Sequence, residues 1–131
     1  MDSSVAIAAI VADHEAHEDA QDALGESDVT IAHVASETYS VLTRLPGALR
    51  LDGSSAASIL GARLPDAYVS LDADAHAAAP ARLAEAHVTG GATYDGLIAL
   101  TALAHELELL SRDHRAARAY RALGVSFRLL R

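Results

Sequence analysis

Segments with the apolar spacing of helices alternate along this chain with short, β-rich runs, and this alternation constrains the fold most strongly. The expected helices cover residues 4–12, 14–24, 33–45, 54–64, 72–87, 93–106 and 114–123. Ser54 is the expected N-cap of the helix over 54–64. The expected strands cover residues 28–32, 66–71, 107–111 and 125–130. Strands that alternate with helices usually form a parallel sheet covered by helices on both faces. We therefore expect an α/β fold, with residues 1–131 forming one domain of three α/β/α layers around a central, mainly parallel sheet.

The residue types that are missing exclude several kinds of chemistry. The chain has no cysteine, which excludes disulfides, thiolate catalysis and cysteine-ligated zinc. It also has no lysine, which excludes a P-loop and a lysine Schiff base. No apolar run approaches the roughly 18 residues of a membrane span, and the N-terminus lacks the basic start of a signal peptide. We therefore expect a cytoplasmic protein with no membrane partner.

The charge is distributed unevenly. The formal net charge is -8, yet residues 112–131 contain six arginines and only one acidic residue. An acidic body could bind cations while this basic strip meets an anion. The alternative is that the arginines form an ordinary solvated helix face.

Four of the 18 acidic residues stand where solubility does not explain them. Asp2 precedes an apolar helix, and Glu37 lies on the apolar stripe of its helix. Asp95 shares a helix face with apolar residues, and Asp113 stands between an apolar strand and a helix. Each could be structural on its own, as a helix cap or a side chain that reaches solvent from an edge. Together they suggest one acidic site at the carboxyl ends of the strands.

An acidic site of this kind favours a divalent cation. Carboxylates packed closely repel one another, and their pKa values rise unless a cation compensates. Oxygen ligands without cysteine suit Mg²⁺ or Mn²⁺. Such an ion among carboxylates is suited to phosphodiester hydrolysis, because it lowers the pKa of bound water and stabilises charge on the phosphate.

Three segments resemble motifs of the PIN-domain family, and within it the VapC-type toxins of bacterial toxin–antitoxin systems. These segments are DSSVAIAAI, ASETYSVLTRLPGALRL and GGATYDGLIALTALAHELELLSRD. They occur in the family's order and extend over almost the whole chain. The resemblance implies a compact α/β fold with a central parallel sheet. It also implies an endoribonuclease that depends on Mg²⁺ or Mn²⁺ and cleaves RNA with a metal-activated water.

The resemblance also implies which residues act. The catalytic and metal-binding residues would be Asp2, Glu37, Asp95 and Asp113. Ser111 would orient a metal-bound water or an acid, and Ser4 would act similarly beside Asp2. In one respect the chain departs from the family, whose members usually have a few apolar residues before the first aspartate. Only Met1 precedes it here, so we expect either a very short first strand or a natural chain that starts earlier.

Arginines and partners complete the interpretation. Arg112 and Arg115 begin a row of arginines spaced by three, and we expect them to contact RNA phosphates. His114 is expected at a helix start facing water, and the four tyrosines are expected to be half-buried packing residues. The family implies a cognate antitoxin that blocks the site, and homodimers or larger toxin–antitoxin complexes. The alternatives are a PIN module that binds RNA or protein without cleavage, a housekeeping RNA-processing nuclease, and a domain whose acids are only caps.

Overall fold

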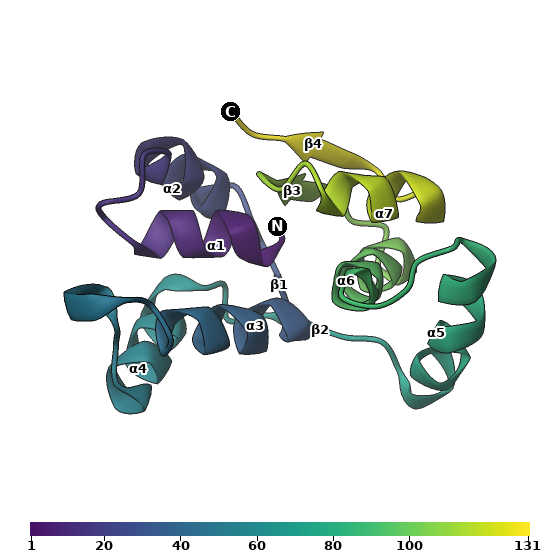
Figure 1. Cartoon of the computed structure of the whole chain (residues 1–131), viewed down its shortest axis with the longest axis horizontal. Coiled ribbons are helices and arrows are strands. Elements are labelled where there is room, and N and C mark those ends of the chain that lie inside the picture. Colours follow the sequence, from purple (N-terminus) through teal and green to yellow (C-terminus); the bar gives the residue numbers. More distant parts are fainter.

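The computed structural model describes residues 1–131 as seven α-helices, one short 3-10 helix and four short strands (Figure 1). The helices are α1 (Ser3–Ile10), α2 (His17–Gly25), α3 (Ala32–Leu42), η1 (Gly47–Leu49), α4 (Gly53–Arg63), α5 (Ala73–Glu85), α6 (Ala92–Ala104) and α7 (Ala116–Leu123). The strands are β1 (Thr30–Ile31), β2 (Tyr68–Val69), β3 (Leu109–Ser111) and β4 (Phe127–Leu129). The α/β fold class predicted from the alternation of segments is confirmed. None of the helices combines the length and the apolar character that crossing a membrane requires.

The strands form two parallel pairs instead of one continuous sheet, β1 with β2 and β3 with β4. The registers place Thr30 opposite Tyr68 and Leu109 opposite Phe127. The N-terminus lies between the two pairs (Figure 1). There the backbone N–H of Asp2 donates to the carbonyl of Leu110 at 2.8 Å. The expected central sheet is thus divided into two parallel pairs. A cavity of about 420 Å³ is lined by Met1 together with residues of β1 and β3.

The main hydrophobic core surrounds α1, which packs against α2, α3 and β3. Its side chains Val5, Ala6, Ala8 and Ala9 are all fully buried. A helix that is apolar on nearly all sides can only be stable when it is enclosed. Alanine side chains also allow the surrounding helices to approach closely. This enclosure fixes the start of α1, and therefore Asp2, at the centre of the molecule.

Aspartates cap the starts of α4 and α5. The Asp52 carboxylate accepts a hydrogen bond from the backbone N–H of Ser55 at 2.9 Å, which caps α4 and holds the pKa of Asp52 below its ordinary value. Asp72 caps α5 in the same way. The prediction that Ser54 is the cap of the α4 helix is wrong, because that residue already lies inside the first turn.

The prediction that all four tyrosines are half-buried is also wrong. Tyr120 is completely buried, whereas Tyr39, Tyr68 and Tyr94 are exposed. The difference arises because α7 turns Tyr120 toward the core, while the other three rings lie at the surface. Spacing along the sequence did not reveal which side of each element would be covered.

Gly96 is a point of close contact between α6 and the end of α5. A Cβ added there would collide with the side chain of Leu83 and lie 3.2 Å from Val88 Cγ1. We therefore predict that Gly96→Ala lowers the free energy of unfolding by about 1–2 kcal/mol, despite the higher helix propensity of alanine. Gly61→Ala in α4, with no atom within 4 Å, should raise it by about 0.5–1 kcal/mol. Urea denaturation of both variants measures the free energy of unfolding. Equal changes in the two variants would contradict the close contact at Gly96.

Candidate functional site

The four predicted acidic residues come from four parts of the chain, and three of them act electrostatically on the fourth, Asp95. They are Asp2 before α1, Glu37 on α3, Asp95 on the first turn of α6, and Asp113 between β3 and α7. The pKa of Asp95 is raised to about 6, chiefly because the side chain is half-buried. The like charges of Glu37, Asp113 and Asp2 raise it further. The charges of the other three carboxylates therefore all act on Asp95, and we call these four residues the acidic group.

Asp2 is a helix cap and a member of the acidic group at the same time. Its Oδ1 accepts from the backbone N–H of Ser4 at 3.0 Å, from that of Val5 at 3.4 Å, and from the Ser4 hydroxyl. Its Oδ2 accepts from the hydroxyl of Tyr120 at 2.8 Å. With a relative exposure of only 3%, Asp2 is held almost entirely by the protein. The role of Asp2 as a helix cap is thus compatible with its membership of the acidic group.

Two serines fix the loop that carries Asp113. Ser4 Oγ accepts from the backbone N–H of Arg112 at 2.8 Å, and Ser111 Oγ accepts from that of Asp113 at 3.0 Å. The Asp113 carboxylate in turn accepts from the backbone N–H of Arg115 at 2.8 Å, at the entry to α7. Ser111 is fully buried, so its hydroxyl has little freedom. Both serines therefore position acidic residues through the backbone.

Glu37 contributes an atom with no partner of its own. Its Oε2 is buried on the inner side of α3 and makes no hydrogen bond. Burial of a polar atom without a partner costs free energy, and such atoms are few in native proteins. This carboxylate oxygen is therefore available to a proton or to a cation.

The chemistry of the acidic group fits a hard divalent cation. It offers only oxygen donors, its like charges raise the pKa of Asp95, and Glu37 contributes an oxygen without a partner. Mg²⁺ and Mn²⁺ prefer such donors. No three His, Asp or Glu side chains lie close enough together here to hold an ion. Binding of a cation would therefore require the carboxylates to move closer together.

Tyr120 was not predicted as a site residue, yet it holds Asp2. Burial, and then the negative charge of Asp2, raise the pKa of its hydroxyl above the ordinary value, so it remains a hydrogen-bond donor. The sequence signal is present in α7, where Ala116 and Ala119 mark a face of small residues that also carries Tyr120. That signal predicts burial, but it does not identify the partner from the other end of the chain.

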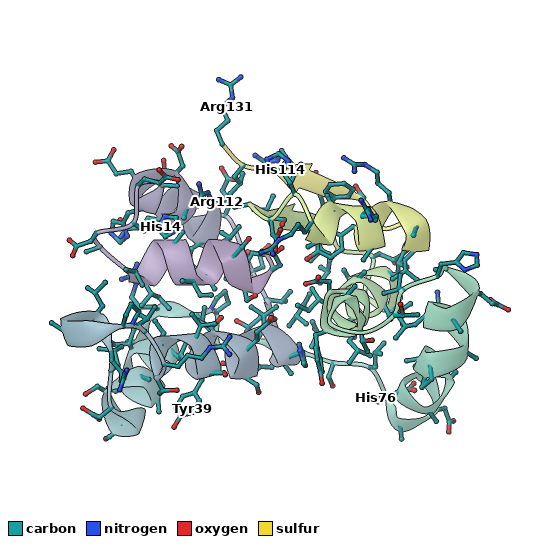
Figure 2. The ribbon with its side chains drawn as sticks, viewed as in Figure 1. His14, Tyr39, His76, Arg112, His114 and Arg131 are labelled. Atoms are coloured by element: carbon teal, nitrogen blue, oxygen red, sulfur yellow. The ribbon has the colours of Figure 1, made fainter.

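The two arginines predicted to contact RNA have different surroundings. The Arg112 side chain is only 17% exposed and donates to His14 Nε2 and to the carbonyl of Arg131, both at 3.4 Å. It also lies 3.8 Å from a carboxylate oxygen of Glu15. Figure 2 shows Arg112 between the α1–α2 pair and the C-terminal strand. The Arg115 side chain is 96% exposed, so of the two it is the one whose guanidinium faces solvent.

This combination of an α/β fold with acids at the start of α1, on α3, on α6 and after β3 defines a class. The family model described as "PIN domain" matches residues 1–122, and the chain belongs to that family. The resemblance seen in three sequence segments is thereby confirmed.

Within the family, the chain is similar to two proteins of Mycobacterium tuberculosis. It is 43% identical to "Ribonuclease VapC40" over 129 residues, which cover 98% of this chain and 96% of that protein. It is 41% identical to "Ribonuclease VapC27" over 126 residues, which cover 95% and 91%. The likeness thus extends over nearly the full length of each protein.

Asp95 makes stability depend on pH in a direction that can be tested. Its pKa is raised from 3.8 to about 6, so folding favours the protonated form. The contribution to stability is complete below about pH 4 and is lost as the pH rises through 6. We predict that Asp95→Asn raises the free energy of unfolding of the metal-free protein at about pH 7.5 by on the order of 1 kcal/mol, discounted for half exposure. Urea denaturation should show this gain shrinking toward pH 4, and a gain that is independent of pH would argue against it.

The hydrogen bond between Tyr120 and Asp2 should contribute to stability. Tyr120→Phe removes the donor and leaves a buried carboxylate oxygen with one partner fewer. We predict a fall of about 1–3 kcal/mol in the free energy of unfolding. The control is Tyr68→Phe, at a ring that is 52% exposed, where the change should stay within about 0.5 kcal/mol. Thermal or urea unfolding compares the two, and a loss no larger than the control's would show that the bond contributes nothing.

Proposed function

We propose that this chain is the toxin of a toxin–antitoxin pair and acts as an endoribonuclease that depends on Mg²⁺ or Mn²⁺. The observation that carries the proposal is the acidic group, where burial and the charges of three other acids raise the pKa of Asp95 to about 6 although Arg115 lowers it. Its position on a PIN domain, and the similarity to proteins named ribonucleases VapC40 and VapC27, support the same activity. Crowded carboxylates destabilise the folded chain, and a module that only bound RNA would gain nothing from them.

Each member of the acidic group has a proposed role. Asp2, Asp95 and Asp113 would hold the cation, and Glu37 would be a direct or water-mediated ligand through its unpartnered oxygen. When bound, the cation would lower the pKa of water and stabilise charge on the scissile phosphate. The protein itself supplies no nucleophile in this proposal. Its residues bind the cation and orient the phosphate.

The neighbouring residues keep the acidic group in position. Tyr120 and Ser4 hold Asp2 from opposite sides, and Ser111 holds the backbone of Asp113. Ligands fixed in this way need less reorganisation when substrate arrives. We propose that these three residues are positioning residues.

The proposed partners follow from the charge of the site. RNA is the substrate, and a cognate antitoxin would block the site with a cationic or amphipathic segment that complements the acidic group. A homodimer, or a larger toxin–antitoxin complex, is the proposed assembly. The relatives share the VapC name with the toxins that the three sequence segments resemble, and that resemblance supports an antitoxin partner for this chain.

Cleavage of a mixed RNA pool tests the proposal directly. The purified chain is expected to cleave RNA with Mn²⁺ and to stop when EDTA is added. Asp95→Asn should lower the rate by more than about 100-fold, since loss of even an outer-shell partner of a metal typically costs 10- to 100-fold. The control is Asp22→Asn, at an exposed aspartate of α2 outside the acidic group, which should retain the rate.

The outcomes of this experiment separate the alternatives. Cleavage that persists in EDTA or in Asp95→Asn would overturn the assigned site. A folded chain that binds RNA without cleaving it in Mn²⁺ would be a binding module. The ends of the fragments would identify the class of RNA that is cut.

A further inference from the structure

A second site lies beside the acidic group, in a depression of about 640 Å³ between α7 and the connection from α5 to α6. Its rim carries His87, His114, Arg115 and Arg118, all exposed. Its floor contains Val88 and Ala119, which are only 6% and 4% exposed. The volume is within the range of small-ligand sites, roughly 300–1,000 Å³. A cationic rim above an apolar floor suits a ligand that is anionic at one end and flat and weakly polar at the other.

The charge of this depression is opposite to that of the rest of the chain. Its lining contains no acidic residue, although the whole chain has a net charge of -8. Four other sizeable depressions are each lined by at least one aspartate or glutamate. None of those four places has a net positive lining, so an anion approaching this protein is attracted to this depression in preference to them.

The depression adjoins the acidic group on two elements. On α6, Ala92 lines the depression and stands three residues before Asp95, so the two share one helix face. After β3, His114 and Arg115 follow Asp113 directly, and Arg115 Nε lies 3.6 Å from the Asp113 carboxylate. Figure 2 shows His114 near the start of α7, at the outside of the molecule. The cationic rim of the depression is thus adjacent to the acidic group.

We propose that this depression binds one nucleotide of single-stranded RNA adjacent to the phosphodiester that the acidic group cleaves. The inference rests on the proposed function and names a part of its substrate site. Arg118, with Arg115, binds the phosphate of that nucleotide, because a guanidinium can donate two hydrogen bonds to phosphate oxygens. The sugar and base lie on the apolar floor of Val88 and Ala119. No aromatic ring other than the two histidines lines the site, so stacking on tyrosine or phenylalanine does not drive recognition.

RNA binding without cleavage tests this site. The probe is a fluorescein-labelled, single-stranded RNA dodecamer of mixed sequence, titrated in EDTA and followed by fluorescence anisotropy. Arg118→Ala should weaken binding by about five- to tenfold at low salt. It should also reduce the slope of log affinity against log salt by about one, the value for one lost phosphate contact. Arg82→Ala, at an exposed arginine of α5 outside the depression, is the matched control and should change affinity less than about twofold.

A second variant separates loss of the guanidinium from loss of fold. Arg118→Lys keeps the charge and loses only the bidentate hydrogen bonding of the guanidinium. Relative to Arg118→Ala, it should recover part of the affinity and of the salt slope. Equal binding by Arg118→Ala and Arg82→Ala would overturn the nucleotide site, as would a wild-type chain that binds no RNA.

The binding measurement is independent of catalysis, because anisotropy reports RNA binding and EDTA withholds the cation that the proposed nuclease requires. If Arg118→Ala binds weakly while the wild type also fails to cleave in Mn²⁺, the nucleotide site stands and the proposed nuclease fails. If the wild type cleaves and Arg118→Ala binds normally, the proposed nuclease stands and the nucleotide site fails.

Discussion

The structure depends on how it accommodates one buried carboxylate. Asp2 is joined to β3 through its backbone, to the start of α1 through Oδ1, and to α7 through the Tyr120 hydroxyl on Oδ2. Burial of an ionised side chain is tolerated only when hydrogen bonds replace its hydration. Here these bonds come from both ends of the chain, so the requirement to satisfy Asp2 also joins the N-terminal helix to the last α/β unit. Stability and the position of a proposed metal ligand thus depend on the same contacts.

The acidic group makes the folded, metal-free chain less stable. Asp95 is half-buried among like charges, and Glu37 keeps an oxygen without a partner. Both features disfavour the folded, metal-free chain. Such features are common where a protein must bind an ion or a substrate, because the missing partner is supplied by the ligand. The destabilisation is offset elsewhere by the buried face of the α1 helix and by the capped starts of α4 and α5.

The arginines that follow β3 lie next to the acidic group, and two of them form part of an anion-attracting surface. Their surroundings differ more than their regular spacing suggested. α7 begins at Ala116, so Arg112 belongs to the preceding loop and does not share the helix face of its successors. Its guanidinium is held by the chain itself, whereas Arg115 and Arg118 line the depression next to Asp113. A spacing of three residues predicts a shared face only where all of the residues are helical.

The sequence alone determined the α/β class and the order of the elements, and it singled out the four acids of the acidic group, because periodicity and family motifs are local properties of the chain. It could not determine that Tyr120 holds Asp2, that Ser4 supports the loop of Asp113, or that the strands divide into two pairs. Tyr120 is 118 residues from Asp2 along the chain. Only tertiary packing could decide this pairing, because burial removed the water with which either side chain would otherwise form its hydrogen bonds.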